Sequence, residues 1–361
     1  MNRLLNNPEQ VVDEMLAGYI ASYPDRFCKL DGYHVLLNKN EKDKVSIVIG
    51  AGGGNEPWPI GYVGEGLADA CSLGNVFAAP TAKSILNAIR YVPNEKGVLC
   101  IATNHAGDVL NFELVAGLAE MEGIHTRQIY VSDDITSAEK TQREERRGIA
   151  GVSLIVKIAA AASEAGLSLE EVYEIASMAN KNIYTVSVTT SPAYILETGQ
   201  PAYELPDGEM EYGMGFNGEK GIERTALSAA DEVMERMVQM LWEDMNLEPG
   251  EEIAVFLNPY KATTVLESYI LMRKCLELLE EKGIKVYDSY VDSLFPTQGA
   301  GGFSLTFLRM DEAYRRYYDQ PADSPLFKKG KVVHKTEAGR TGRKSFYGST
   351  KRPDAAEAEG K

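Results

Sequence analysis

The sequence predicts an α/β protein made of two α/β domains, the first with a mainly parallel sheet covered by helices on both faces. Three short strand-like runs carry this prediction: residues 45–50 (VSIVIG), 98–102 (VLCIA) and 125–134 (HTRQIYVSDD). Each run ends in a polar or Gly-rich segment, and helical periodicity follows. Strands with continuous apolar character that alternate with helices are typical of a parallel sheet buried on both sides.

The helices expected in the first domain follow from apolar side chains that recur every three to four residues. Ser168 and Glu171 form a capping box at the start of one of them. Gly166 is a stop signal for the helix before it. The expected helices are residues 8–22, which Pro24 ends, 81–92, which Thr81 caps, 109–121, 148–166 and 169–181.

The pattern changes near residue 183, where we place a domain boundary. The first domain then covers residues 1–183 and the second α/β domain residues 184–334. Residues 335–361 lack apolar periodicity and are expected to form a disordered tail. The second domain is expected to contain strands at 183–191, 252–258, 285–291 and 302–310, helices at 225–246, 262–282 and 311–319, and a Gly/Pro/Glu-rich stretch at 197–224.

Charge and composition exclude several classes of protein. The 361 residues include 37 Lys and Arg against 53 Asp and Glu, so the net charge is −16. Such a chain repels phosphate backbones and anionic bilayers, which argues against nucleic acid and membranes as partners. No apolar run reaches the ~20 residues of a membrane span, and the polar start is unlike a signal peptide. The four widely spaced cysteines predict reduced thiols in a cytoplasmic protein, without a metal site.

The first candidate site is the Gly-rich segment 50–57 (GAGGGNEP), which follows the first strand. Glycines at a strand end let backbone N–H groups approach a ligand closely, although a tight turn alone also uses them. The segment is not a P-loop, because no Lys-Ser/Thr pair follows. It also departs from a dinucleotide fingerprint, because Asn55 stands where the third glycine belongs. A nucleotide-binding enzyme that uses this turn is therefore the weakest hypothesis.

The second candidate site is the segment 103–108 (TNHAGD), which follows the second strand. In open α/β sheets, ligands bind outside the carboxyl ends of the strands. Asp108 is therefore either a helix cap or a functional carboxylate, and His105 either an ordinary loop residue or part of a site. A third Gly-rich segment, 211–219 (EYGMGFNGE), is by itself readable as turns between strands.

Together these segments resemble the substrate-binding K subunit of dihydroxyacetone kinase. The matching motifs run in order along the chain: GAGGGNEP and GYVGEGLADA (61–70), GNVFAAPT (74–81), NHAGDVLNFE (104–113), RRGIAG (146–151), EMEYGMGFNGEKGIER (209–224) and GGFSLTFLRMDE (301–312). The resemblance implies a homodimer of two-domain α/β chains in cytoplasmic glycerol metabolism. It implies that Gly52, Gly53 and Gly54 contact the substrate and that Asp108 accepts a hydroxyl proton.

The same resemblance implies that this chain binds no cofactor itself. ATP or a phosphotransferase-system donor, with Mg, is expected on a separate L-type nucleotide-binding subunit. Nothing like that subunit follows residue 320 in the sequence.

The departures from the family pattern bear on chemistry. Asn55 and Asn217 stand where the family has histidines, and the second of these histidines forms a hemiaminal with the substrate carbonyl. Thr103 replaces a lysine, and His105 stands where the family has tyrosine. Asparagine is neither a nitrogen nucleophile nor a proton-transfer base near neutral pH. Covalent capture of a ketone at residue 217 is therefore not expected.

Two functional hypotheses follow. In the first, the chain is a subunit of a phosphotransferase of the glycerone kinase type. It holds a small ketose or polyol non-covalently through Asn55, Thr103, His105 and Asn217, with Asp108 as the base. In the second, it is a non-catalytic paralogue that binds a small ligand and acts as a regulatory or coactivator subunit, which the loss of both imidazoles favours.

Overall fold

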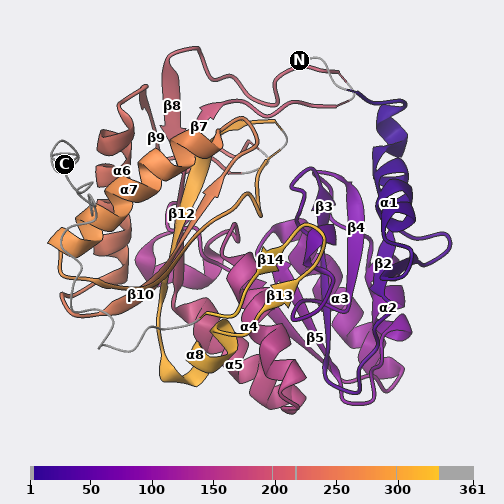
Figure 1. Ribbon diagram of the computed structural model, residues 1–361. Helices are drawn as coiled ribbons and strands as arrows, with labels where there is room; N and C mark the ends of the chain where they lie inside the picture. The colour runs from indigo at the N-terminus through magenta and orange to yellow at the C-terminus, as the bar shows by residue number, and fades with distance from the viewer. Residues whose placement is uncertain (1–3, 197, 216–217, 298, 333–361) are drawn as a thin grey trace, which may run out of the picture. The chain divides into compact units, whose positions relative to one another are not determined.

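The computed structural model describes residues 4–196, 198–215, 218–297 and 299–332 and contains two six-stranded sheets with helices packed against them (Figure 1). This confirms the predicted fold class. The strands of the first sheet all lie before residue 183 and those of the second begin there. A boundary between two domains at this residue stays a prediction. The predicted tail at 335–361 lies outside the described residues.

The first sheet has the strand order β1-β2-β4-β3-β5-β6, and its β4, β3, β5 and β6 run parallel. The first two strands pair antiparallel at one edge. The sequence predicted β3, β5 and β6 but missed the other three, because β1 and β2 are only three and four residues long and polar residues interrupt β4. The strands are β1 (Phe27–Lys29), β2 (Val35–Asn38), β3 (Ser46–Gly53), β4 (Ala70–Val76), β5 (Val98–Thr103) and β6 (Thr126–Val131).

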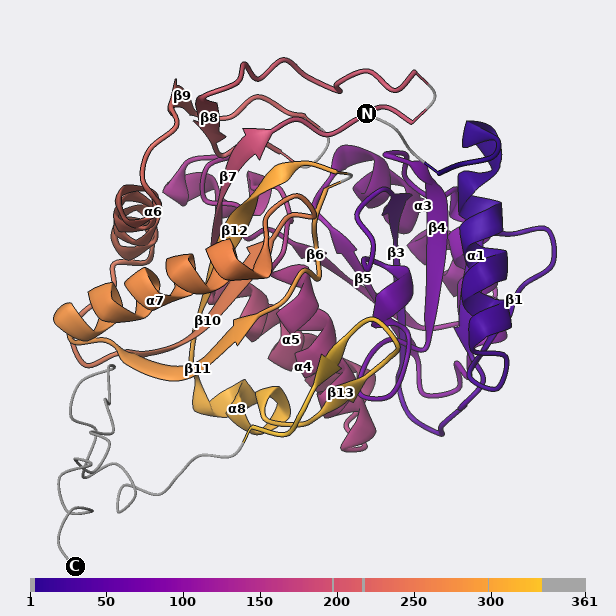
Figure 2. The same cartoon turned by 45° about the horizontal axis from the view of Figure 1, so that its top comes forward.

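Helices cover both faces of this sheet. Helices α2 (Ala82–Tyr91) and α3 (Ala106–Met121) form one apolar core with alternate strand residues such as Val48 and Cys100. Because successive strand side chains point to opposite faces, their neighbours in the strands face the other side. There α4 (Val152–Glu164) and α5 (Leu169–Lys181) lie across from α3 (Figure 2).

The second sheet has the order β11-β10-β12-β7-β8-β9, in which only β10 and β11 run parallel. Helices α6 (Ala230–Met245) and α7 (Val265–Glu281) share one apolar core with its central strands (Figure 2). The strands are β7 (Ile183–Ser191), β8 (Glu209–Tyr212), β9 (Glu223–Ala226), β10 (Glu252–Pro259), β11 (Lys285–Val291) and β12 (Gly301–Arg309). The remaining elements are α1 (Val11–Ser22), α8 (Glu312–Tyr318), the short strands β13 (Ala322–Asp323) and β14 (Lys328–Lys329), and the 3₁₀ turns η1 (Pro8–Gln10), η2 (Ile60–Tyr62) and η3 (Lys140–Glu145).

Capping side chains determine where several helices begin. The Ser168 side chain accepts from the backbone N–H of Glu171, and the Glu171 carboxylate accepts from that of Ser168, so the predicted capping box is present. The Thr81 hydroxyl likewise caps α2. The helix expected at 109–121 instead begins at Ala106, three residues earlier, so Asp108 lies inside its first turn and is not the cap. Residue 105 takes the cap position in an extended conformation.

The two sheets meet where the chain leaves β6. The Asp133 carbonyl accepts from the N–H of Thr185 in β7 at 2.7 Å, and the N–H of Ile135 donates back to the Thr185 carbonyl at 3.0 Å. The buried Asp133 carboxylate accepts from the N–H groups of Ile149 and Gly151 at 2.7 and 2.8 Å. One short segment thus joins both sheets and fixes the turn before α4.

Arg147 connects this junction to the loop after β8. Its guanidinium bonds the fully buried Asp134 carboxylate at 2.8 and 3.1 Å and also donates to the carbonyl of Gly213 at 2.9 Å. Asp134 also accepts from the Thr136 hydroxyl at 2.6 Å. The Gly-rich loop that begins at residue 213 is therefore tied to the end of β6.

No helix among the described residues combines the length and the apolar character that crossing a bilayer requires. The four cysteines are unpaired, and Cys71, Cys100 and Cys275 are buried.

Replacing Arg147 by Met should destabilise the fold strongly, because it leaves the Asp134 carboxylate buried without its cation. Breaking such a pair costs about 3–5 kcal/mol of unfolding free energy, which urea denaturation measures. Arg127→Met is the control: Arg127 pairs with Glu170 on the exposed surface, and its loss should change stability little. Equal losses in the two variants would contradict the role given to Arg147.

Candidate functional site

A pocket of about 270 Å³ lies at the carboxyl ends of β3 and β5. Loops from the second half of the chain close it from the other side. It brings together three of the predicted site segments, as expected for ligand sites in open α/β sheets. Its lining residues are Ala51, Gly52, Asn55, Trp58, Phe77, Ala78, Ala79, Thr103, His105, Ala106, Gly107, Asp108, Glu219 and Phe295.

Asp108 is the most informative of these residues. It is the third residue of α3, and only 6% of its surface is exposed. Its Oδ2 accepts from the Thr103 hydroxyl at 3.4 Å, whereas its buried Oδ1 has no partner among the described residues. A buried carboxylate oxygen without a partner is costly, so a ligand hydroxyl at this point would relieve the cost.

Burial raises the pKa of Asp108 to about 7, with the Thr103 hydrogen bond opposing the rise. A position near a helix N-terminus by itself favours the ionised form. The first-turn field is worth ~2 kcal/mol at most, and loss of hydration outweighs it here because no basic side chain among the described residues pairs with this carboxyl. Near neutral pH the carboxyl therefore exchanges readily between its two protonation states.

His105 lies beside Asp108 and bridges to the second half of the chain. Its Nε2 lies 3.0 Å from the carbonyl oxygen of Gly148, which can only accept, so Nε2 carries the proton. Burial lowers the pKa of His105, which favours the neutral ring. Its Nδ1 then holds a lone pair, 3.9 Å from a carboxylate oxygen of Glu219. This lone pair can accept a hydrogen bond from a ligand hydroxyl.

Asn55 and Thr103 form two further polar points of the wall. The Asn55 side-chain amide donates to the carbonyl of Pro296 at 2.8 Å, so this residue also ties the pocket to the loop after β11. Thr103 is buried at the end of β5 and shares its hydroxyl with Asp108.

The glycines of the first loop serve packing as much as ligand access. A Cβ on Gly52 would lie 2.7 Å from the backbone N and O of Ala78. Gly54 has a φ of +103°, and a Cβ there would press on the Phe77 ring. Gly52 lines the pocket, whereas Gly53 and Gly54 do not. Asn217, the remaining predicted residue, lies outside the described residues.

Five of the fourteen lining residues were predicted as site residues, and four of the other nine have large or charged side chains. Trp58, Phe77 and Phe295 form the apolar walls, and Glu219 supplies a carboxylate from the loop that follows β8. Phe77 has a φ of +56°, a conformation rare for a bulky side chain, and such outliers occur at functional sites. Glu219 stood in the GFNGE motif that we had quoted, but only the folded chain shows that it reaches the strand ends.

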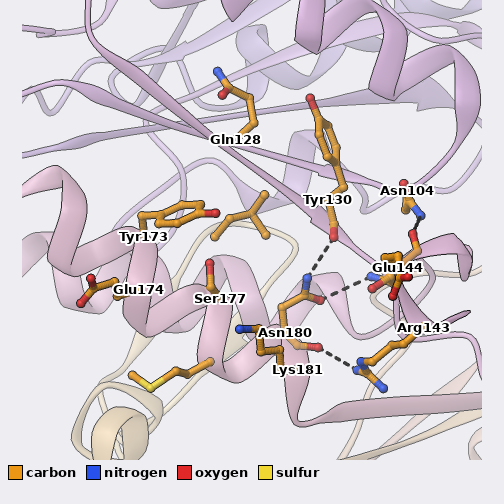
Figure 3. A pocket seen from close by; sticks show the side chains of 13 residues that line it. Asn104, Gln128, Tyr130, Arg143, Glu144, Tyr173, Glu174, Ser177, Asn180 and Lys181 are labelled. Atoms are coloured by element: carbon orange, nitrogen blue, oxygen red, sulfur yellow. Dashed lines mark hydrogen bonds between the residues drawn. The ribbon is translucent and has the colours of Figure 1, made fainter. Parts of the chain in front are cut away.

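A larger hollow of about 720 Å³ lies between β6 and α5 (Figure 3). In it, the Asn180 amide donates to the Tyr130 carbonyl at 2.9 Å, and Arg143 donates to the Asn180 carbonyl at 2.7 Å (Figure 3). These polar groups fasten α5 to the edge strand. Asn104, from the candidate segment 103–108, lines this hollow, but none of the residues predicted to bind or react with a ligand does, so we assign it no ligand.

Among the described residues, no group of three or more His, Cys, Asp or Glu side chains is arranged to hold a metal ion.

Comparisons with known proteins agree on one family. The sequence matches the Dak1 domain over residues 17–326. It is 39% identical over 333 residues to the dihydroxyacetone-binding subunit DhaK of PTS-dependent dihydroxyacetone kinase 2 from Listeria innocua, covering 91% of this chain and 99% of that one. It is 27% identical over 356 residues to the dihydroxyacetone-binding subunit DhaK of the PEP-dependent kinase of Escherichia coli, covering 92% and 100%.

Two kinds of solved structure are similar. The dihydroxyacetone kinase operon co-activator DhaQ superposes with a TM-score of 0.80 at 30% identity, over 85% of this chain and 95% of that one. The dihydroxyacetone kinase of C. freundii in complex with AMP-PNP and Mg²⁺ gives 0.82 at 26% identity, over 93% of this chain and 62% of that one.

The raised pKa of Asp108 predicts a pH-dependent gain from Asp108→Asn. The folded chain binds this proton more tightly than the unfolded chain, whose carboxyl titrates near 3.8, so wild-type stability falls as pH rises from 4 to 7. A displacement of about three pKa units corresponds to up to about 4 kcal/mol. The variant should be the more stable protein at pH 8, and little of that gain should remain at pH 4.5.

Chemical denaturation at both pH values measures the gain. Glu120→Gln, on the exposed side of the same helix, is the control and should show no such difference between the two pH values. An Asp108→Asn variant that is less stable than wild type at pH 8 would show that the carboxyl is ionised and well solvated.

Proposed function

The chain belongs to the Dak1 domain family, and from this premise we propose that it is the substrate-binding subunit of a dihydroxyacetone-kinase-like phosphotransferase. It holds a small ketose or polyol, such as dihydroxyacetone, without a covalent bond. The observation that carries the proposal is the buried Asp108 oxygen without a partner in the pocket of about 270 Å³. The DhaK subunits named above, which are described as dihydroxyacetone-binding, support the choice of ligand.

The chemistry of the wall suits an uncharged ligand rich in hydroxyls. Asp108 Oδ1 and His105 Nδ1 accept hydrogen bonds, and protonated Asp108 can donate one. Trp58 and Phe295 offer apolar surface to the carbon skeleton. A base works best when its pKa lies near the working pH, and Asp108 meets this condition for removing a hydroxyl proton.

The phosphoryl donor, in this proposal, is held by a partner. ATP or a phosphotransferase-system donor, with Mg, sits on an L-type subunit, and this chain supplies position and a base. Support comes from the C. freundii kinase, whose complex contains AMP-PNP and Mg²⁺ and of which this chain matches 62%. The unmatched remainder has room for a nucleotide site. A cytoplasmic location, which the unpaired thiols favour, and a homodimeric state belong to the same proposal.

The second candidate is a ligand-binding co-activator without catalysis. Two observations favour it: the similarity to the co-activator DhaQ at 30% identity, and the asparagine at position 55 in place of an imidazole. Both candidates bind the same class of ligand. They differ in whether a bound ketose is phosphorylated when a donor subunit is added.

Turnover of the wild type with a donor subunit separates these two candidates, and Asp108→Asn tests the base. The amide keeps the shape of the side chain but cannot take a proton, so phosphorylation should fall by ~10²–10⁴-fold while ligand affinity changes little. A thermal-shift screen of C3–C5 ketoses and polyols identifies the ligand, since binding at 100 times Kd adds ~2.7 kcal/mol. A coupled assay with a donor subunit then measures turnover, and the chain alone with ATP should give none.

Thr103→Ser is the control, because it keeps the hydroxyl beside Asp108 and should keep most of the activity. Wild-type protein that binds a ketose but is never phosphorylated with competent donor subunits favours the co-activator. Near-normal turnover in Asp108→Asn removes this residue as the base.

We also expect dihydroxyacetone to bind without a covalent adduct, because residue 217 is asparagine and the neutral His105 is tied to Gly148. Intact mass spectrometry of protein incubated with the ketone should show unmodified protein. ¹³C NMR of ligand labelled at the carbonyl carbon should show no carbon bonded to the protein. An adduct that maps to His105 would instead give this residue the role of a nucleophile.

A further inference from the structure

The outer face of α3 is an apolar surface that begins beside the pocket. Leu110, Leu114 and Met121 are 71%, 56% and 84% exposed. With the exposed Gly117 they follow the 110-114-117-121 spacing that places residues on one side of a helix. We call these four residues the α3 stripe.

This helix is apolar on both sides. Phe112, Val115 and Ala119 on its inner side are buried in the core with α2 and the sheet. A surface helix normally presents polar side chains opposite its core side, and a helix apolar all round is normally buried all round. Single exposed apolar residues are common, but an aligned row marks an interaction site.

The position of the stripe indicates that a protein bound to it would lie close to the pocket. Ala106 and Gly107, in the first turn of the same helix, line the pocket, and Asp108 follows them. A protein lying along the stripe is therefore brought to the mouth of the pocket. A Cβ on Gly117 would meet nothing within 4 Å, so the fold itself does not require glycine there. The small residue leaves space for a partner to approach.

The charge around the α3 stripe argues against a second copy of this chain as the protein that binds it. Helix α3 contains no Lys or Arg, and Glu113 and Glu120 flank the stripe on one side. Arg90, the basic side chain that reaches the end of this helix, bonds Glu122 at 2.8 Å. An antiparallel pair of α3 helices would bring glutamates together, and each chain carries a net charge of −16.

We propose that the α3 stripe is the docking surface for the protein that carries the phosphoryl donor, and that this partner presents an apolar ridge flanked by Lys or Arg. This inference rests on the proposed function, because a donor must reach a hydroxyl held at Asp108. A partner with basic flanks complements Glu113 and Glu120, which favours association and orients it.

Leu227 offers a matched control position. It follows β9 and is 57% exposed, much as Leu114 is at 56%. A charge introduced there burdens an exposed leucine in the same way without touching the stripe.

The test uses full-length chains with Leu114→Glu, Leu110→Glu and Leu227→Glu. The probe is the set of remaining subunits of the Listeria innocua PTS-dependent dihydroxyacetone kinase 2, whose own DhaK subunit is the positive control. We expect Leu110→Glu and Leu114→Glu to weaken binding of the donor subunits at least tenfold and to lower phosphorylation in parallel. Ketose binding in the thermal-shift assay should stay unchanged, and Leu227→Glu should behave as wild type.

Each other outcome counts against the proposal. Wild-type affinity in Leu114→Glu, an equal loss in Leu227→Glu, or no binding of wild type where the Listeria subunit binds would overturn it. So would a Leu114→Glu variant that turns a dimer into monomers by size-exclusion chromatography, since the stripe would then join two copies. A different result would show that the proposed function is wrong while the docking surface is right. In that case the donor subunits bind at the stripe, yet the wild type neither binds nor phosphorylates a ketose.

Discussion

The pocket depends on the buried acidic pair Asp133 and Asp134, which follows β6. Asp133 pairs with β7 through its backbone and holds the turn before α4 through its carboxylate. Asp134 binds Arg147, which in turn holds the carbonyl of Gly213 at the start of the loop that carries Glu219. These two buried carboxylates stabilise the fold only if every one of their hydrogen-bond donors is in place. The same donors fix the position of the loops from the second half of the chain that lie opposite Asp108.

A site residue is predictable from the sequence when it directly follows a predicted strand. Thr103, His105 and Asp108 follow β5, so the rule that ligands bind at carboxyl strand ends predicts their shared edge. Phe295 and Glu219 come from distant loops, and only tertiary contacts bring them there. The capping box of Ser168 and Glu171 was predictable because its hydrogen bonds lie within four consecutive residues. An edge strand such as β1 forms only by pairing with a neighbouring strand, here β2, which the sequence of β1 alone does not show.

The protonation of the pocket could not be read from the sequence either. A helix N-terminus favours an ionised Asp108, but burial without a cation raises its pKa and lowers that of His105. The pocket therefore combines a carboxyl near its titration point with a neutral imidazole. An uncharged ketose or polyol suits such a wall. A phosphate ester does not, because a dianion would face Asp108 and Glu219, and in the proposed function this repulsion favours release of the product.

Helix α3 connects this chemistry to the surface. Its first turn places Asp108 in the pocket, its inner side anchors it in the core, and its outer side carries the α3 stripe. A partner that covers the stripe excludes water from the mouth of the pocket. Water exclusion strengthens the electrostatic interactions around Asp108 and protects a phosphoryl donor from hydrolysis. In the proposed function, the exposed leucines and the buried carboxylate are two parts of one requirement: the base is solvated poorly enough to bind a hydroxyl, and the donor arrives only with the protein that seals the site.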